Sequence, residues 1–257
     1  MNIVVLMKQV FDTEEKIIIQ NGQIQEDGVE FIINPYDEYA IEEAVKWKEE
    51  VGGEVTVISY GPPRAENALR TALAMGADKA VLIEQPHDGK EADEYVLSHI
   101  FAAEMKQHSY DLVLGGNMAV DTGSGQVAIR VAEALGISHV STITKLTIEE
   151  QKATVQRDVE GDIEVLEVTL PFVATAQQGL NEPRYPSLPG IMKAKKKPLK
   201  RVSLKELSLT EEQRSSQTTV LEQYLPAKKQ AGRILTGDKN EQVRTLVQML
   251  RSEAKVI

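Results

Sequence analysis

The sequence DLVLGGNMAVDTGSGQVAIRVAEALG, residues 111–136, places a short apolar run, a glycine-rich loop and an amphipathic segment in direct succession. The run Leu112–Gly115 has the length and composition of a buried strand. Residues 124–135 carry apolar side chains at helical spacing, and Gly136 is a typical residue for a helix end. This order predicts one strand of a parallel sheet, followed by one of the helices that cover the sheet.

Three similar units precede this stretch. We expect strands at Ile3–Met7, Val55–Ser59 and Ala80–Glu84. We expect helices at about residues 35–51, 64–75 and 92–107, the first of them with Asn34 as its N-cap and Pro35 as its first residue. The alternation favours an α/β fold with a doubly wound, mostly parallel sheet of the Rossmann-like, adenine-nucleotide-binding type.

Later segments have the two-residue period of antiparallel strands. This period is found at residues 142–147, 153–159 and 163–169, with a turn at Glu160-Gly161 between the last two. Phe172–Ala176 is apolar throughout, so we expect it to return to the central sheet. The sheet should therefore have an antiparallel extension.

Two further elements are expected outside the sheet. Asn21-Gly22 between apolar runs predicts a hairpin over residues 16–25. Near the C-terminus, one amphipathic helix is predicted by apolar residues at i, i+3, i+4 and i+7, namely Val243, Leu246, Val247 and Leu250. Such a helix is marginal in water without packing, so it lies either on its own core or on another chain. We expect a core at residues 1–200 and a C-terminal arm at residues 201–257.

Composition excludes several classes of function. The chain has 257 residues, a formal net charge of -10 and no Cys. Without Cys there are no disulfides, thiol catalysis or cysteine-bound iron–sulfur clusters, so an electron carried by this protein must reside on an organic cofactor. The negative charge argues against nucleic acid as a partner. No apolar run approaches the roughly 18 residues of a membrane span, and Ile3–Met7 is too short for a signal peptide. We expect a cytoplasmic protein without membrane insertion.

The sequence lacks the motifs of several enzyme classes. Neither a G-x-S-x-G elbow nor a G-x-x-x-x-G-K-[ST] phosphate loop occurs, and the histidines are too scattered for a metal-binding pair: His87, His99, His108 and His139. The first predicted helix carries four carboxylates that we interpret as a solvated face near a helix N-terminus: Asp37, Glu38, Glu42 and Glu43. No bond-making active site is therefore expected.

Open parallel sheets bind ligands at the carboxyl ends of their strands, where the strand order changes. Three segments are expected to meet there: residues 6–8, residues 34–37 and the loop 115–126. Backbone N–H groups of this loop suit a phosphate, and they belong to Gly123, Ser124, Gly125 and Gln126. The loop also satisfies a relaxed dinucleotide motif, but no suitable acidic residue follows about 20 residues later, so a nicotinamide is not expected. The loop is either a structural turn or a nucleotide site.

The stretch LNEPRYPSLPGIMKAKKK, residues 180–197, places prolines directly before a lysine cluster and belongs to the expected core. The prolines restrict the backbone, so we expect Leu188, Ile191 and Met192 on a segment that is neither a strand nor an ordinary helix. Rigid apolar residues beside cations suit the docking of an acidic partner. The alternative is a solvated basic turn without a partner.

This stretch resembles the signature of the β subunits of electron-transfer flavoproteins. The resemblance extends to Asn34-Pro35 before a helix, to RTALAMGAD at residues 70–78 and to DLVLGGNMAVD at residues 111–121, and it covers about residues 1–200. It implies an αβ heterodimer that passes electrons from flavin dehydrogenases, such as the acyl-CoA dehydrogenases of fatty acid oxidation, to a downstream quinone-linked oxidoreductase. It also implies FAD held mainly by the α subunit and AMP bound structurally in this chain.

The family's functional residues can be placed on this sequence. The resemblance implies a nucleotide site lined by Leu6, Asn34, Tyr36, Asp37, Tyr60, Asp121, Gly123, Ser124, Gly125, Gln126 and Val127. It implies a dehydrogenase-docking surface made of Leu188, Pro189, Ile191 and Met192, with Lys193, Lys195 and Lys196 to steer the partner. The terminal helix would then pack on the α subunit.

Two alternative functions stay open. One is the β subunit of an electron-bifurcating relative, in which a second FAD replaces AMP; the loop AVDTGSGQ is shorter than the family's usual one and lacks the continuation typical of the bifurcating members, which favours the simple carrier. The other is a stand-alone adenine-nucleotide-binding module of the stress-protein type. Such modules end with their last core strand, whereas this chain continues well beyond Phe172.

Overall fold

The computed structural model describes residues 1–86, 92–229 and 231–257, which form two units. The first unit comprises residues 1–18 and 25–221, and the second comprises residues 19–24 and 222–257. Residues 201–221, which the sequence analysis assigned to the arm, thus belong to the first unit.

A large sheet forms the centre of the first unit. Its strands in chain order are β1 (Asn2–Met7), β6 (Glu54–Gly61), β7 (Lys79–Glu84), β8 (Leu112–Gly116), β9 (Ser138–Glu149), β10 (Lys152–Val159), β11 (Asp162–Thr169), β12 (Phe172–Ala176) and β13 (Leu199–Ser203). They are arranged in the order β11-β10-β9-β12-β8-β1-β6-β7-β13. All neighbours from β9 to β13 pair in parallel, whereas β10 and β11 are antiparallel. The predicted α/β fold with a mostly parallel sheet is confirmed.

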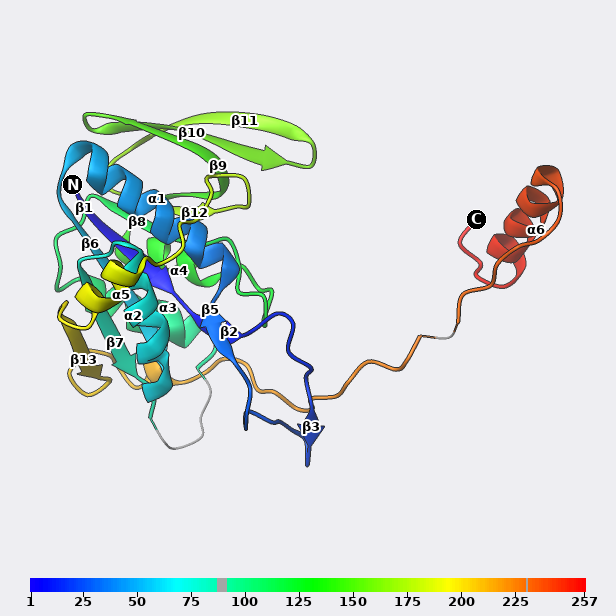
Figure 1. Ribbon diagram of the computed structural model, residues 1–257, viewed down its shortest axis with the longest axis horizontal. Coiled ribbons are helices and arrows are strands. Elements are labelled where there is room, and N and C mark those ends of the chain that lie inside the picture. Colours follow the sequence, from blue (N-terminus) through cyan, green and yellow to red (C-terminus); the bar gives the residue numbers. More distant parts are fainter. Residues whose placement is uncertain (87–91, 230) are drawn as a thin grey trace. The chain divides into compact units, whose positions relative to one another are not determined.

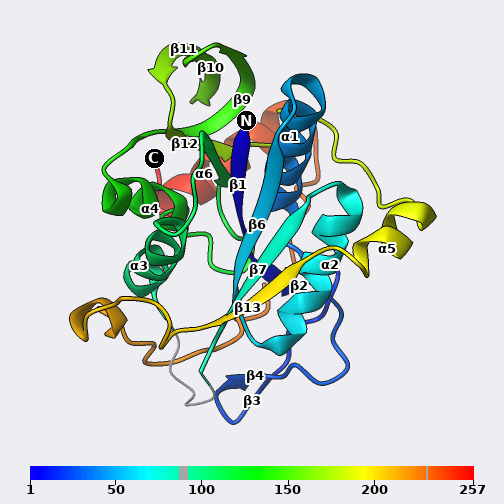
Figure 2. The same cartoon turned by 90° about the vertical axis from the view of Figure 1, so that its left-hand side faces the viewer.

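Helices cover both faces of this sheet, as Figure 2 shows. They are α1 (Pro35–Val51), α2 (Glu66–Met75), α3 (Glu94–Met105), α4 (Val127–Leu135) and α5 (Leu188–Ala194), with short 3₁₀ turns η1 (Pro63–Ala65) and η2 (Glu212–Arg214). In Figure 1, α1, α2 and α5 lie in front of the sheet, and α3 and α4 lie behind it. Strand β1 contributes side chains to the apolar layers on both faces of the sheet. Ile3 and Val5 are buried on the first face, and Val4 and Leu6 on the second.

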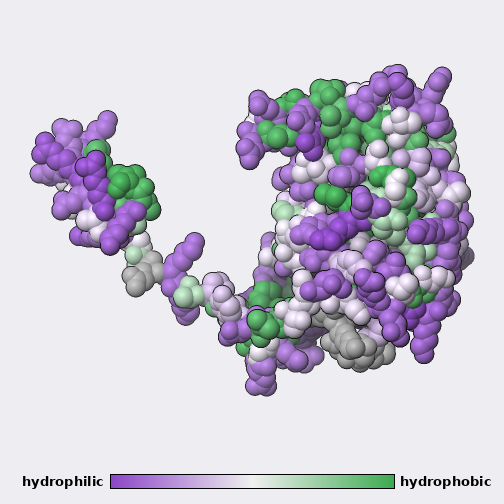
Figure 3. Space-filling model, turned by 180° about the vertical axis from the view of Figure 1, so that it is seen from behind, coloured by the Kyte–Doolittle hydropathy of each residue, from purple (hydrophilic) through white to green (hydrophobic). Residues whose placement is uncertain are grey.

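The antiparallel extension is also present. β9 pairs in parallel with β12 through its first half and antiparallel with β10 through its second half, so one strand joins the two parts of the sheet. β12 is buried throughout between β9 and β8, as predicted for a strand that returns to the centre. At the other edge of the extension, Ile163 and Val165 of β11 are exposed, and the apolar surface of this region is visible in Figure 3.

Two elements differ from the sequence expectation. Leu188 and Ile191 lie on a short helix, α5, so the prediction of a non-helical segment was wrong. The fixed backbone of Pro189 suits the first turn of a helix, and the Ser187 hydroxyl accepts a hydrogen bond from the Gly190 N–H at 3.1 Å. Strand β13 was not predicted, and it pairs in parallel with β7 at the edge of the sheet.

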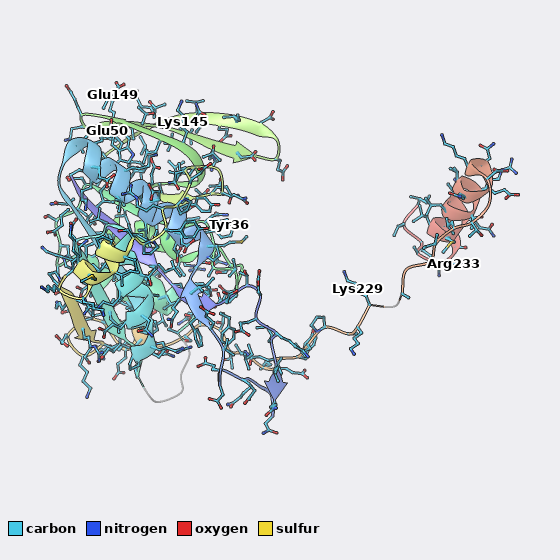
Figure 4. The ribbon with its side chains drawn as sticks, in the orientation of Figure 1. Tyr36, Glu50, Lys145, Glu149, Lys229 and Arg233 are labelled. Carbon is cyan, nitrogen blue, oxygen red and sulfur yellow. The ribbon has the colours of Figure 1, made fainter. Side chains whose placement is uncertain are left out.

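Small elements complete the first unit. β2 (Gln9–Phe11) and β5 (Phe31–Ile33) form an antiparallel pair that leads from β1 into α1. In Figure 4, Tyr36 stands at the amino-terminal end of α1 and Glu50 near its other end. The amino-terminal end of α1 is thus reached directly from β5.

The second unit contains the predicted hairpin and the predicted terminal helix. The hairpin pairs β3 (Ile19–Gln20) with β4 (Gln23–Ile24), and both turn residues, Asn21 and Gly22, have positive φ. The helix α6 (Lys239–Ser252) is capped by the Asp238 carboxylate, and Val243 and Leu246 are exposed on it. Figure 3 shows an apolar patch on this helix. The patch has no partner within the described part of the second unit.

None of the helices in the described residues is both long enough and apolar enough to cross a bilayer. No group of three or more metal-ligating side chains occurs within residues 1–86, 92–229 and 231–257. His87 lies outside the described residues.

Candidate functional site

The strand order changes between β1 and β8. From β1 the chain passes through α1 to β6 and then through α2 to β7, whereas α3 brings it back to β8 on the other side of β1. Ligands of open parallel sheets bind beyond the carboxyl ends of the strands at such a point. The segments that lie there are the residues after β1, the start of α1 and the loop after β8.

Asn34 occupies the N-cap position of α1, but its side chain makes no capping hydrogen bond. The side chain instead holds the loop after β8, because its Nδ2 donates to the Met118 carbonyl at 2.9 Å and its Oδ1 accepts from the Val120 N–H at 3.1 Å. Asn34 is buried, so these bonds are shielded from water. Asn34 is therefore the residue at the predicted N-cap position, but its side chain does not cap the helix.

The carboxylate of Asp37 points into the protein. Its Oδ2 accepts the Lys8 N–H at 2.7 Å, and its Oδ1 accepts the Gly116 N–H at 2.9 Å. Burial raises the pKa of Asp37 to about 7, although these two hydrogen bonds, the side chain of Asn34 and the charge of Lys8 act in the opposite direction. The interpretation of this carboxylate as part of a solvated face was wrong, because it satisfies two backbone donors at the ends of strands.

Gly116 is the closest neighbour of this carboxylate on β8. A Cβ atom at this position would stand 2.7 Å from the Cβ of Tyr36 and would overlap Oδ1 of Asp37. Only glycine therefore lets the end of β8 approach the first turn of α1.

Lys8 links the end of β1 to the loop after β8. Its backbone carbonyl accepts the Asn34 N–H at 2.9 Å, and its ammonium forms an ion pair with Asp121 at 2.7 Å. Both side chains of the pair are partly exposed, so the pair contributes little to stability but places two opposite charges at the site. The sequence analysis placed Lys8 in this region but did not assign its side chain a role.

The glycine-rich loop ends at α4. The helix begins at Val127, three residues later than predicted, so Gly123 to Gln126 are loop residues. Gly123 and Gly125 have φ values of 66° and 62°, which favour glycine. The Gly123 N–H is not available to a ligand, because it donates to the Ala119 carbonyl at 2.8 Å. Among the described residues, the N–H groups of Ser124, Gly125 and Gln126 have no partner in the chain.

Three other predicted site residues lie close to this loop or to its strands. Leu6 is buried near the end of β1, and its Cβ lies 3.7 Å from where a Cβ of Gly115 would be. Tyr36 is partly exposed beside Gly116, and Tyr60 is partly exposed near the carboxyl end of β6. The structure thus brings the three predicted segments together, while the binding of a nucleotide by them stays a prediction.

The predicted docking surface lies on α5. Leu188 is 79% exposed, Met192 is 71% exposed and Ile191 is 43% exposed, which places three large apolar side chains in contact with water on one short helix. Pro189, Lys193, Lys195 and Lys196 are exposed as well. A groove of about 380 Å³ lies between α5 and α2 and is lined by Arg70, Thr71, Ala74, Pro186, Ile191, Ala194 and Lys195.

Two other cations of the lysine cluster are not free. The Lys197 ammonium donates to the carbonyls of Leu73 and Ala77 at 2.9 and 2.6 Å, and burial lowers its pKa. Arg201 pairs with Glu66 at 2.6 Å. These two residues hold the chain in place, whereas the three lysines predicted to steer a partner are exposed.

Arg184 ties the segment before α5 to α1. Its guanidinium contacts both oxygens of Glu42, at 2.8 and 3.0 Å, and both oxygens of Glu49, at 2.7 and 3.0 Å. Nearby, Glu43 accepts hydrogen bonds from Asn181 and Trp47 at 2.9 and 3.1 Å. Glu42 and Glu43 are buried, so the interpretation of a solvated face was wrong for them too.

Comparisons with known proteins find similarity to one family. The family model of the electron transfer flavoprotein domain matches residues 21–207. The chain is 58% identical, over 257 residues and the whole of both chains, to the electron transfer flavoprotein subunit beta of Bacillus subtilis (strain 168). It is 41% identical to the protein of the same name in Syntrophomonas wolfei, with 100% of this chain and 98% of the relative covered.

A third relative has a different name. It is the caffeyl-CoA reductase-Etf complex subunit CarD of Acetobacterium woodii, which is 38% identical over 260 residues, with 98% of this chain and 99% of the relative covered. Together, the match of the domain and the full-length similarity to subunits beta show that the chain belongs to the electron transfer flavoprotein family, as one of its beta subunits.

Proposed function

We propose that this chain works as the β subunit of a heterodimeric electron carrier, which takes electrons from flavin dehydrogenases, acyl-CoA dehydrogenases among them, and delivers them to a downstream quinone-linked oxidoreductase in the cytoplasm. FAD held mainly by the α subunit supplies the redox chemistry. This chain completes the flavin site and presents docking surfaces, and it makes no covalent bond itself. The observation that carries the proposal is the similarity to subunits beta over the full length, arm included.

AMP is the nucleotide that we propose for the site at the carboxyl ends of β1 and β8. The site fits a phosphate, because the N–H groups of Ser124, Gly125 and Gln126 have no partner among the described residues and directly precede α4. Lys8 and Asp121 add a cation and an anion beside them. Asn34, Leu6, Tyr36, Tyr60, Gly123 and Val127 would complete the lining.

Cofactor counting tests this proposal. The chain is co-expressed with an α subunit, the complex is purified, and the nucleotides released on denaturation are quantified by chromatography. We expect one FAD and one AMP per αβ pair. Two FAD molecules and no AMP would identify a bifurcating carrier instead. A chain that purifies as a folded monomer and never associates with the α subunit would favour the stand-alone nucleotide-binding module.

The docking role of α5 is tested by kinetics. Leu188→Ala removes the most exposed apolar side chain of α5, so we expect slower reduction of the complex by an acyl-CoA dehydrogenase with an unchanged flavin spectrum. Val51→Ala is the matched control, because Val51 is an exposed apolar residue at the end of α1. Equal rates for Leu188→Ala and the wild type would remove the anchor role.

The steering role of the lysines predicts an association rate that depends on salt. Lys193, Lys195 and Lys196 are exposed, so their charges act through water and are screened by salt. We expect a triple Lys→Gln variant to associate more slowly with the dehydrogenase at low ionic strength and at nearly the wild-type rate at high ionic strength. A deficit that is independent of salt would point to lost contacts instead.

A further inference from the structure

Asp37 connects the two strands between which the strand order changes. Each oxygen of its carboxylate accepts one backbone N–H, from Lys8 directly after β1 and from Gly116 at the end of β8. The side chain is only 5% exposed, so it has little surface left for a ligand. A residue in this position fixes the spacing of the strand ends.

The end of β8 continues into the glycine-rich loop, and the end of β1 is linked to this loop by a side chain. Gly116 is the residue from which the loop starts, and the Lys8 ammonium pairs with Asp121 inside it. Asn34, from the same end of α1, holds the loop at Met118 and Val120. The N–H groups at residues 124–126 therefore stand at the end of a segment whose starting point is set by Asp37.

We propose that Asp37 is a positioning residue of the nucleotide site: its carboxylate holds the ends of β1 and β8 and thereby places the loop that binds the phosphate of AMP. This inference rests on the proposed function, because it takes AMP as the ligand of this site. It changes the role of Asp37 from a lining residue to one that acts through the backbone.

The carboxylate can do this only when both of its oxygens are free to accept. Protonation places a hydrogen on one oxygen and removes the negative charge, so the hydrogen bonds from the N–H groups of Lys8 and Gly116 become weaker. Burial raises the pKa of Asp37 to about 7, so this change falls near neutral pH. The charged groups around it in the described structure are Lys8, which pairs with Asp121, and Glu38 in the next position of α1. Affinity for AMP should therefore fall as the pH falls through 7.

The test compares Asp37→Asn with Glu38→Gln in the full chain bound to its α subunit. The control removes a half-buried carboxylate from the same helical turn, and the Glu38 side chain has no hydrogen bond in the described structure. AMP is titrated calorimetrically into nucleotide-free complexes between pH 6 and 8. At pH 8 we expect Asp37→Asn to bind AMP about tenfold more weakly than the wild type, because an amide can accept only one of the two N–H groups. Glu38→Gln should match the wild type.

The pH profile separates positioning from a general structural effect. The phosphate of AMP titrates near pH 6 and affects all complexes alike. The wild type and Glu38→Gln should lose further affinity below pH 7, and Asp37→Asn should not. Wild-type affinity and a wild-type profile in Asp37→Asn would overturn the inference alone. A wild-type complex that binds no AMP would overturn the proposed nucleotide site, and the inference with it.

Hydrogen exchange gives a second readout if Asp37→Asn does not fold. In the wild-type complex, the protection of peptides that cover residues 112–126 should change between pH 8 and pH 6 after correction for the intrinsic exchange rate, because the carboxylate that holds Gly116 titrates in this range. Equal protection at both pH values would overturn the inference.

Discussion

At the scale of the residue, Gly116 is a position of the candidate site that tolerates little change. A methyl group there would press against Tyr36 and Asp37 in the first turn of α1, so either β8 or α1 must move. We expect Gly116→Ala to lower the free energy of unfolding by about 1–3 kcal/mol, as overpacking does, and to weaken AMP binding. Thermal denaturation measures the first effect. Gly232→Ala is the control, because a Cβ at Gly232 would have no neighbour within 4 Å.

Asp37 should affect how the free energy of unfolding depends on pH. Its pKa is about 7 in the fold and near 3.8 in the unfolded chain, so between these values the native state holds a proton that the unfolded state has released. Low pH therefore favours the native state. From pH 5 to pH 7 we expect the wild type to lose up to about 1.4 kcal/mol per pH unit relative to Asp37→Asn. Above pH 7 the difference should be constant.

Denaturant unfolding of both proteins across this range measures the difference. Other groups titrate equally in the two proteins and cancel. A difference that does not change between pH 5 and pH 7 would contradict the assignment of a raised pKa to Asp37.

Side-chain roles were the part of the site that the sequence predicted least well. Asp37 and Glu42 stand in the first turns of a helix, where carboxylates are usually exposed, so the sequence predicts solvated side chains for both. Their partners are distant in sequence: Gly116 is 79 positions from Asp37, and Arg184 is 142 positions from Glu42. No local pattern reports a contact of that kind. The glycine-rich loop was predictable, because its glycines are a local signal.

At the scale of the element, hydrogen bonds from two cationic side chains to backbone carbonyls connect α2 with α5 and the residues that follow it. The Lys197 ammonium, which follows α5, donates to the carbonyls of Leu73 in the last turn of α2 and of Ala77 just beyond it. In return, Arg70 of α2 donates to the carbonyls of Ala194, the last residue of α5, and of Lys197, both at 3.0 Å. Each cation thus satisfies carbonyls that a helix end leaves unpaired.

Removal of Lys197 should loosen α5 without unfolding the core. We expect Lys197→Met to raise hydrogen exchange over residues 188–197 by about tenfold and to leave α1 unchanged, because the two hydrogen bonds to α2 are lost. Exchange measured by mass spectrometry checks this. Lys196→Met is the control, because the exposed Lys196 side chain has no partner in the described structure. Equal exchange in both variants would show that Lys197 does not hold α5.

Regular elements were predicted where a single period dominates the sequence. The central strands are continuous apolar runs, and β10 and β11 alternate, so each carries its own signal. β13 was missed because its exposed residues include Lys200 and Arg201, which looked like part of the lysine cluster rather than an edge strand. α5 was missed because its prolines suggested an irregular segment, although Pro189 lies in the first turn, where a helix accepts it.

At the scale of the whole molecule, the second unit carries an apolar helix face that has no partner among the described residues of that unit. Val243 and Leu246 of α6 are 53% and 47% exposed. If this face packs on the α subunit, Val243→Asp combined with Leu246→Asp should reduce the yield of co-purified heterodimer at least tenfold, because charges would replace buried apolar contacts. The first unit should keep its melting temperature.

The control for this variant keeps the charge and the spacing. Thr245→Asp combined with Gln248→Asp adds the same two charges three positions apart, on exposed residues of the same helix. This pair should leave the heterodimer intact. Equal yields for both double variants would show that α6 does not contribute to the interface.

Because α5 precedes the edge strand β13 in the chain, a truncation directly after α5 removes a strand of the central sheet. β13 follows α5 directly and covers the outer side of β7, with all five of its residues in register. A chain that stops after residue 197 would leave β7 as a bare edge, with unpaired backbone groups and the buried side chain of Val202 removed from the apolar layer. Such an edge recruits strands from other molecules. A truncated chain that ends directly after α5 should therefore aggregate, whereas one that ends at residue 221 keeps its edge closed.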